Sequence, residues 1–510
     1  MKQPPASQGR HAGVDAGALR AGAGGGTPRL DVAGLLAAHE HELMDLHERH
    51  LNPALVAVLK TLGFDHNYVR GEGAYLFDDR GRRYIDCLGG YAVFACGRNH
   101  PVVRDAIKQA MDLDLPSLPG VGLFRCSGLL AKELVHMAPG ATAQRPGELE
   151  MVYFASAGGE AMDSALKFAR RATGRTRIVY CHRSYHGLTL GSLAITGNAE
   201  FRDGFGPMME GTVEIPFNDL AALELELTRG DVAAFVTEPI QGKGVNIPAE
   251  DFLRRASGLC AKHGALFVVD EIQTGLGRTG TWFACEQFGA GDSWTPDILV
   301  LAKALSGGYC PVSAVLMKKW IHARTFDGMA NCAKMQNTFG QNDLSMVAGL
   351  AALHVMRHER IVENASDVGK YLTDGLREKL SRYAMVKDVR GRGLMVAIEF
   401  GRPDTLVLRT AWDAVHKADA SLFCQSIIVP LMAEHGVLAQ VAGHRLDVIK
   451  LIPTLVFSKA DADEVIKALD VTIGAIHKGV GPAWIIPRLG AAALKRFVPT
   501  ARPGRPAAAV

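Results

Sequence analysis

Short, nearly continuous apolar runs that alternate with helical stretches constrain this chain more than any other feature of its sequence. The runs lie at residues 151–157 (MVYFASA), 177–182 (RIVYCH), 233–239 (AAFVTEP), 265–270 (ALFVVD) and 298–303 (ILVLAK). EAMDSALKFARRAT and DFLRRASGLCAKHG, which lie between them, have helical patterns, and Gly264 is placed to end the second. Apolar strands alternating with helices predict a mostly parallel sheet covered on both faces, and so an α/β fold.

The chain, at 510 residues, is long enough for a large enzyme body with a smaller lobe. The composition of residues 1–30 predicts a disordered tail, and that of residues 481–510 a flexible extension. We expect residues 31–115 to form an N-terminal helix and a small-lobe segment with a hairpin at 71–86. Residues 116–385 are expected to form the large domain and residues 386–480 a C-terminal small domain. The predicted smaller α+β lobe therefore draws on both ends of the chain.

Charge and cysteine content restrict the class of partner. The net charge is only +3 and the charged residues are interspersed, which argues against nucleic acid, and no apolar run is long enough to span a membrane. The nine cysteines are scattered without a CxxC pair, which favours reduced thiols in the cytoplasm. The histidine-rich segment near His41 does not complete an HExxH motif, so no metal site is expected. Small molecules are the expected partners.

Residues that carry chemistry follow several of the apolar runs. Ligands of parallel α/β sheets bind beyond the carboxyl ends of the strands, so these positions are candidates. Gly158 and Gly159 come between a run and a helix, which suits a phosphate group or a plain tight turn. Asp270 ends a buried run and should have a cationic partner. Lys303 ends another run, and its amine could serve as a salt-bridge partner or as a nucleophile.

A GxGxxG pattern at Gly275, Gly277 and Gly280 offers an alternative interpretation. In dinucleotide-binding folds this pattern directly follows a strand and opens a long helix. Here DEIQT intervenes, and TWFACEQFG is a poor start for a helix. A nicotinamide-dependent oxidoreductase is therefore a minority hypothesis.

A family resemblance emerges from several segments taken together: SAGGEAMDSALKFAR, YHGLTLGSLAITG, TEPIQGKG, VVDEIQTGLGRTG, DILVLAKALSGG and NTFGQND. In order and spacing the chain resembles class III pyridoxal-phosphate aminotransferases of fold type I over about residues 51–475. This family includes ornithine, 4-aminobutyrate and putrescine aminotransferases. The resemblance implies pyridoxal 5'-phosphate as cofactor and a transaminase that acts on amine and keto or aldehyde substrates.

The resemblance also implies roles for individual residues. Lys303 matches the family's Schiff-base lysine, which also moves a proton between substrate and cofactor. Asp270 matches the carboxylate that pairs with the pyridine nitrogen. Gln273 matches the residue at the ring's phenolic oxygen, and Tyr185 the aromatic that stacks on the ring. His186 either supports this site or is a packed histidine.

Further matches concern the phosphate and the assembly. Gly158 and Gly159 take the phosphate-cradle position, although Ser156-Ala157 precedes them where Asn-Ser is usual in the family. Glu238 matches a glutamate near the ring, for which we expect a positioning role. Thr338 matches a threonine that reaches the phosphate from the neighbouring subunit. That match implies a homodimer with shared active sites.

The chain departs from the family where substrate would bind. Lys450 stands where many members that act on amino acids carry arginine, and Lys243 stands where ornithine-type members carry glutamate. Lysine cannot form the bidentate fork of arginine, so recognition of an α-carboxylate is in doubt. Either the site accepts an amine or aldehyde without an α-carboxylate, or the lysines bind an acidic group such as phosphate, or both lysines face solvent.

Pocket residues inferred from the resemblance favour a substrate without an α-carboxylate. Tyr91 or Val93 stands at a position that lines the family's substrate pocket, and such side chains suit an apolar substrate arm. Arg392 could bind an acid, although a structural role in a turn is expected. The leading hypothesis is therefore a transaminase for an amine or aldehyde lacking an α-carboxylate. Its alternatives are an ornithine or acetylornithine type, an aminomutase or racemase, and a non-catalytic scaffold.

Overall fold

The computed structural model describes residues 29–119, 122–141, 148–289, 294–418, 421–443 and 447–478. The two predicted tails therefore lie outside the described residues, apart from residues 29 and 30. The chain divides into two compact units, residues 1–67 and 68–510, which are treated separately below. The domain boundaries expected from the sequence stay predictions.

The first unit is helical, and two of its helices begin at side-chain caps. They are α1 (Val32–Ala38), a 3-10 helix (Glu40–Glu42), α2 (Leu43–His50) and α3 (Pro53–Leu62). Asp31 caps α1 by accepting a hydrogen bond from the Gly34 amide at 3.0 Å, and Asn52 caps α3 in the same way. Gly63, with φ +71°, ends α3. The helical pattern predicted from Asp31 is thus present, but it is broken after α1 and again after α2.

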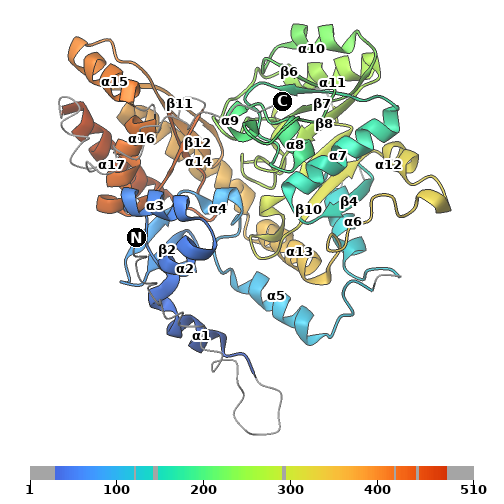
Figure 1. Cartoon of the computed structure of the whole chain (residues 1–510), viewed down its shortest axis with the longest axis horizontal. Coiled ribbons are helices and arrows are strands. Elements are labelled where there is room, and N and C mark those ends of the chain that lie inside the picture. The colour runs from blue at the N-terminus through green and yellow to red at the C-terminus, as the bar shows by residue number, and fades with distance from the viewer. Residues whose placement is uncertain are drawn as a thin grey trace, which may run out of the picture. The chain divides into compact units, whose positions relative to one another are not determined.

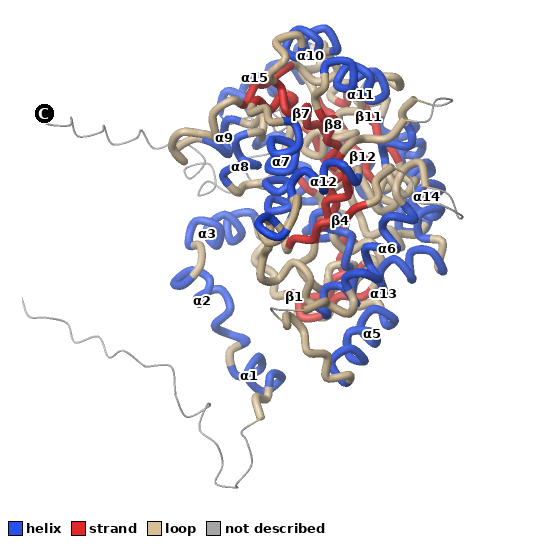
Figure 2. Tube along the Cα trace, turned by 90° about the vertical axis from the view of Figure 1, so that its right-hand side faces the viewer, coloured by secondary structure: helices blue, strands red, loops and turns tan. Residues whose placement is uncertain are grey.

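The second unit is built around a seven-stranded sheet in the order β4-β10-β9-β8-β7-β5-β6. Its strands are β4 (Met151–Ala155), β5 (Arg177–Cys181), β6 (Thr212–Ile215), β7 (Val232–Thr237), β8 (Leu266–Asp270), β9 (Ile298–Leu301) and β10 (Ser313–Met317). Only β10 pairs antiparallel, with β4 and β9, so the prediction of a mostly parallel sheet is confirmed. In Figure 2 these strands run through the middle of the unit, with helices around them. Two strands, β6 and β10, were not predicted.

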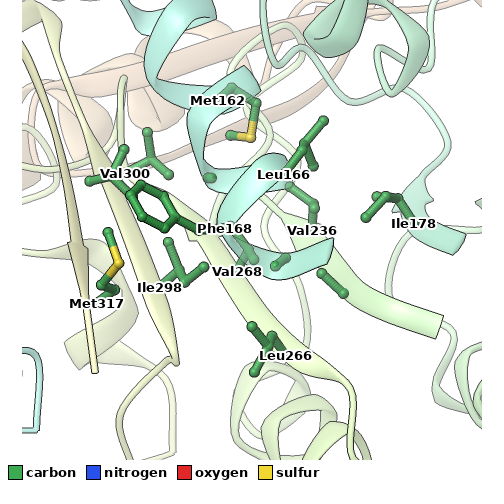
Figure 3. Packing of buried hydrophobic residues seen from close by; sticks show 14 of the residues in the cluster. Met162, Leu166, Phe168, Ile178, Val236, Leu266, Val268, Ile298, Val300 and Met317 are labelled. Carbon is green, nitrogen blue, oxygen red and sulfur yellow. The ribbon is translucent and has the colours of Figure 1, made fainter. Parts of the chain in front are cut away.

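Helix α7 (Gly158–Thr173) joins the sheet into one apolar core. It contacts β4, β7, β8, β9 and β10 along its length. Figure 3 shows three of its buried side chains, Met162, Leu166 and Phe168, packed among strand residues. Those strand residues include Val236, Val268, Ile298, Val300 and Met317. This packing fixes where the N-terminus of α7 meets the sheet, which matters for the site below.

Two smaller sheets complete the unit. One has the order β1-β2-β3-β13 and the other β11-β12-β15-β14. Their strands are β1 (Tyr68–Glu72), β2 (Tyr75–Asp78), β3 (Arg83–Asp86), β11 (Val386–Arg392), β12 (Met395–Phe400), β13 (Val437–Leu438), β14 (Gln440–Ala442) and β15 (Val448–Leu451). The predicted hairpin is present, and Val437 of β13 pairs with Ile85 of β3. Chain segments from both ends therefore meet in one lobe, as predicted, which Figure 1 shows as blue strands beside red and orange helices.

Other helices cover these sheets. They are α4 (Gly89–Ala92), α5 (Pro101–Asp112), α6 (Ser127–Met137), α8 (Leu190–Ala194), α9 (Ala199–Arg202), α10 (Leu220–Leu227), α11 (Phe252–His263), α12 (Lys319–Thr325), α13 (Asp343–His358), α14 (Ile361–Leu380), α15 (Leu406–Ala418), α16 (Ser421–His435) and α17 (Lys459–Lys478). Gly264 adopts φ +67° and ends α11, as predicted. Among the described residues, no helix combines the length and apolar character needed to cross a membrane. The described residues also contain no cluster of three metal-ligating side chains.

Candidate active site

A cavity of about 940 Å³ opens at the carboxyl edge of the central sheet. It collects residues from strand ends, from the start of α7 and from strands β14 and β15 of one smaller sheet. Predicted site residues that line it are Tyr91, Val93, Gly158, Gly159, Tyr185, His186, Glu238, Lys243, Asp270, Gln273, Lys303 and Lys450. The tertiary structure thus brings together side chains that are up to several hundred residues apart in sequence.

Lys303 and Asp270 occupy the ends of two neighbouring parallel strands. Asp270 is the last residue of β8, and Lys303 follows β9 as the first residue of a 3-10 helix (Lys303–Ser306). Lys303 has φ +41°, which lies in the left-handed region that a lysine rarely adopts. Desolvation lowers the pKa of Lys303, while Asp270 and Glu238 oppose this shift.

The carboxylate of Asp270 is buried and held by two hydrogen bonds. Its Oδ2 lies 2.7 Å from Nδ1 of His186, and its Oδ1 accepts a hydrogen bond from the Ile272 amide at 3.0 Å. Burial opposes the charge on His186, but the hydrogen bond to Asp270 and the negative charges of Asp270 and Glu238 together outweigh it, so the pKa of His186 lies above its ordinary value. Of the two roles expected for His186, this contact favours a residue that holds Asp270 in place over a histidine that only fills space.

The N-terminus of α7 faces the cavity without a side-chain cap. Ala157 precedes the helix, Gly158 and Gly159 form its first turn, and all three line the cavity. A Cβ added at Gly159 would lie 3.1 Å from Oγ1 of Thr189, so the space beside this turn is narrow. Free amide groups at a helix N-terminus bind anions, which fits the predicted phosphate cradle.

Glu238 connects two segments of the cavity wall. Its carboxylate accepts hydrogen bonds from the Gly242 amide at 2.8 Å and from the Tyr185 amide at 3.1 Å. Burial raises the pKa of Glu238 to about 7. These contacts are those of a residue that positions the backbone around Tyr185, as expected from the sequence.

Lys450 is buried and contacts neutral groups. It lies in the middle of β15 with only 4% of its surface exposed, and Nζ donates to the Gly242 carbonyl at 2.9 Å and to Oε1 of Gln273 at 3.4 Å. Desolvation lowers its pKa to about 7, with Lys303 and Arg278 contributing like-charge repulsion. The expectation that this lysine could face solvent is therefore wrong.

Lys243 also lies on the cavity wall, where its charge is already paired. Its ammonium forms an ion pair with Glu200 and lies 4.9 Å from the ring centroid of Phe201. The side chain of Lys243 is only 15% exposed, so it too does not face solvent as one expectation held. Glu200 and Phe201 belong to α9, and neither was identified from the sequence, because nothing in NAEFRDGF marks it as a cavity segment.

Two further predicted residues lie apart from the cavity. Arg392 forms an ion pair with Glu250, which agrees with its expected structural role, and Thr338 is an exposed loop residue. Neither is among the cavity-lining residues. The glycines of the GxGxxG pattern form turns instead of opening a helix, and the next element is a 3-10 helix (Ala284–Gln287).

Comparison with known proteins explains this combination of fold and site. The family model for class-III aminotransferases matches residues 60–473. The chain belongs to the class-III aminotransferase family. Family members depend on pyridoxal phosphate, so the predicted fold type, enzyme class and cofactor are confirmed. The nicotinamide hypothesis and the non-catalytic scaffold are not supported.

Individual class-III relatives show how far the similarity extends. Aminotransferase PigE from a Serratia species is 32% identical over 459 residues, and the match covers 84% of this chain but 52% of PigE. Acetylornithine aminotransferase from Bacillus cereus is 35% identical over 333 residues, covering 65% of this chain and 81% of that protein. The ornithine aminotransferase structure from Toxoplasma gondii has a TM-score of 0.74 at 27% identity, covering 88% of this chain and 99% of that one. The chain thus spans about half the length of PigE.

Proposed function

We propose that this protein is a pyridoxal-phosphate aminotransferase that moves an amino group between a primary amine and an aldehyde or keto acceptor. The observation that carries the proposal is the meeting of Lys303, Asp270 and the N-terminus of α7 at one cavity. An amine, a buried carboxylate and free helix amides complement the aldehyde, the pyridine nitrogen and the phosphate of this cofactor. The residues present therefore fit the group that the family uses.

The residues divide the work as follows. Bound pyridoxal phosphate supplies an electrophilic carbon and an electron-accepting ring. Asp270, oriented by His186, would hold a proton on the ring nitrogen. Gln273 would contact the phenolic oxygen, and Tyr185 would stack on the ring. Desolvation lowers the pKa of Lys303, which favours the neutral amine that would be needed to accept a proton from a substrate carbon and return it.

The cavity favours a substrate without an α-carboxylate. Lys450 cannot supply a bidentate fork, its protonation is disfavoured by burial, and it donates to Gly242 and Gln273. Lys243 is paired with Glu200, so it offers little charge to a substrate acid. Tyr91 stands on the cavity wall in a left-handed turn with φ +62° and adds aromatic surface. These contacts support an amine or aldehyde substrate over phosphate or an amino acid.

Two related activities remain as alternatives within the same fold. The relatives named above include ornithine and acetylornithine aminotransferases, whose substrates carry carboxylates. An aminomutase or racemase would use the same lysine but return the amino group to the same carbon skeleton. A transaminase releases a free aldehyde or keto product from the donor, whereas an aminomutase or a racemase does not. Detection of that product therefore distinguishes the transaminase from these two activities.

A half-reaction screen tests the proposal. The cofactor-loaded protein is mixed with putrescine, ornithine, 4-aminobutyrate, alanine, glutamate and a long-chain primary amine, and the visible absorbance of the bound cofactor is followed. We expect the fastest change with amines that lack an α-carboxylate, and no change with Lys303→Ala. A decisive preference for ornithine or glutamate would refute the substrate assignment, and failure to bind the cofactor would refute the enzyme assignment.

The proposal extends to assembly and location. Thr338 is exposed and outside its own cavity, which supports a role in the cavity of a neighbouring subunit within a homodimer. All nine cysteines are free, and this supports a reducing, cytoplasmic location.

A further inference from the structure

We infer that Phe201 is a specificity-determining residue, and that it selects substrates whose amino group is attached to an unbranched apolar arm. This inference rests on the proposed function and assigns the part of the substrate that the cofactor does not contact. Phe201 lies on α9 and lines the cavity. Its ring meets Tyr185 edge to face, with centroids 5.4 Å apart and an interplanar angle of 77°. The ring therefore stands directly beside the residue proposed to stack on the cofactor.

An ion pair holds the Phe201 ring in place. Nζ of Lys243 lies 4.9 Å from the ring centroid, and the same ammonium pairs with Glu200, the residue before Phe201. A cation over an aromatic face is attractive, and the adjacent carboxylate fixes the position of that cation. One turn of chain thus supplies both the ring and the acid that neutralises the lysine. Lys243 therefore acts on the substrate through Phe201, as a positioning residue.

The segment that carries Phe201 is anchored on further sides. Nη1 of Arg202 donates to the Tyr180 hydroxyl at 2.9 Å, next to an ion pair between Arg202 and Glu214 at 3.6 Å. On the opposite flank, the carbonyl of Lys243 accepts a hydrogen bond from the Gly443 amide at 3.0 Å. Since these contacts exist within the protein alone, the ring is ordered before a substrate arrives, and binding does not have to order it.

Neighbouring cavity residues continue the apolar wall. Val93, Leu188, Ile272 and Val441 line the same cavity, from four separate segments of the chain. Of the described lysines on the wall, Lys303 is assigned to the cofactor, Lys243 pairs with Glu200, and buried Lys450 is held by neutral acceptors, so an acid at the end of the arm has no free lysine to pair with. A hydrocarbon arm brings no polar group of its own that would need a partner on this wall. The ligand chemistry that fits is a linear alkyl amine or the corresponding aldehyde.

A chain-length series tests this inference. The rate of cofactor conversion is measured for linear primary amines from propylamine to octylamine, with the wild-type protein and with Phe201→Ala. Each methylene buried against the wall should raise kcat/KM about fourfold in the wild type. Phe201→Ala should flatten this dependence, so that the ratio of the octylamine rate to the propylamine rate falls well below the wild-type ratio. Calorimetric binding of the matching linear alcohols should show the same difference without any turnover.

Matched variants separate specificity from folding. Phe205→Ala removes the same side chain from the same segment, but Phe205 is 65% exposed and is not a cavity residue, so the wild-type dependence should persist. Lys243→Met should lower kcat/KM of the longest amines by about two- to fivefold through loss of the cation-aromatic contact. Visible absorbance of the bound cofactor confirms that each variant keeps an intact site.

The outcomes distinguish the two proposals. If Phe201→Ala keeps the wild-type dependence on chain length, the inference is wrong although the amine assignment stands. If Lys243→Met impairs only 4-aminobutyrate and spares alkyl amines, Lys243 binds a substrate acid and the inference is also wrong. If no amine of the series converts the cofactor while an amino acid does, the proposed substrate class fails together with the inference.

Discussion

At the scale of single residues, the site is built from ionisable groups whose burial changes their protonation. Lys450, Lys303 and Glu238 all have pKa values shifted by burial toward their neutral forms. Such shifts are concentrated at functional sites, because catalysis needs groups that exchange protons near neutral pH. One prediction concerns Lys450, a member of this group, and a second concerns Asp270, which lines the same cavity.

Lys450→Met should change how stability depends on pH. The pKa of Lys450 falls from 10.5 to about 7 on folding, so between these values the unfolded chain holds a proton that the folded chain has released. The resulting destabilisation is complete below pH 7 and disappears as the pH approaches 10.5. Lys450→Met lacks this cost, so its thermal midpoint should exceed that of the wild type most at about pH 6 and least at about pH 10. Thermal unfolding followed by circular dichroism measures the gap.

A control for this prediction is Lys319→Met, which removes an exposed lysine at the start of α12. Its gap from the wild type should stay constant over the same pH range. A constant gap for Lys450→Met as well would contradict the inferred burial of that charge.

Asp270→Asn should weaken cofactor binding while preserving the shape of the site. The substitution removes the charge that we propose faces the pyridine nitrogen, and it disturbs the hydrogen bond to His186. Loss of a charged hydrogen bond costs about 1.5–3 kcal/mol, so the Kd for pyridoxal phosphate should rise about 10- to 150-fold. Fluorescence titration of the apoprotein measures this, and an unchanged Kd would exclude Asp270 as the pyridine partner.

At the scale of secondary structure, the N-terminus of α7 is the element that most directly shapes the site. Its position is set by apolar contacts of Met162 and Phe168 with the central sheet, shown in Figure 3, and its first turn is left uncapped. Packing against the sheet holds the helix in place, so its N-terminus needs no side-chain cap. The free amides of its first turn therefore face the cavity.

Gly159→Ala should impair phosphate binding at this turn. The added methyl group would lie 3.1 Å from Oγ1 of Thr189 and 3.3 Å from its Cγ2, which forces the turn or its neighbour to move. We expect a weaker affinity for pyridoxal phosphate, and a smaller effect on pyridoxal, which lacks the phosphate. Competition titrations of the two ligands measure the difference.

Gly258→Ala provides the matched control in another helix. Gly258 lies inside α11, and a Cβ there meets no atom within 4 Å. That variant should be about 0.5–1 kcal/mol more stable, with unchanged cofactor affinity. If Gly159→Ala weakened both cofactor forms equally, the turn would not be the phosphate cradle.

At the scale of the whole molecule, the proposed homodimer makes each active site depend on two chains. Lys303→Ala and Thr338→Asp should each inactivate the protein, the second because a carboxylate repels phosphate. In a heterodimer of the two variants, one site would contain both changes and the other neither. After subunit exchange in an equal mixture, about one quarter of the wild-type activity should return.

Recovery of activity in the mixture depends on Thr338 acting across the dimer. If Thr338 acted within its own chain, every site in the mixture would contain one of the two substitutions, and no activity would return. Sedimentation equilibrium of the wild-type protein reports independently whether a dimer forms.

The sequence by itself determined the fold class, because strand and helix patterns are local, and it pointed to residues at the strand ends that line the cavity. The apolar runs before Asp270 and Lys303 were read as strands, and a strand end is a position that sequence can identify. The sequence did not predict strands β6 and β10, because TVEI and SAVLM are short and no flanking pattern marks them as strands. The prediction about substrate recognition came from the residue types at positions 243 and 450. They indicated that Lys243 and Lys450 matter for substrate choice, but not which residues these lysines contact.

Only the tertiary structure decided what those lysines contact. Glu200 and Phe201 are 43 and 42 positions before Lys243, and Gln273 is 177 positions before Lys450. No periodicity connects such residues, because their proximity results from the packing of helices and loops around the sheet. Burial by that packing also lowers the pKa of Lys450, since the shift reflects the loss of water around the amine and not the identity of its sequence neighbours.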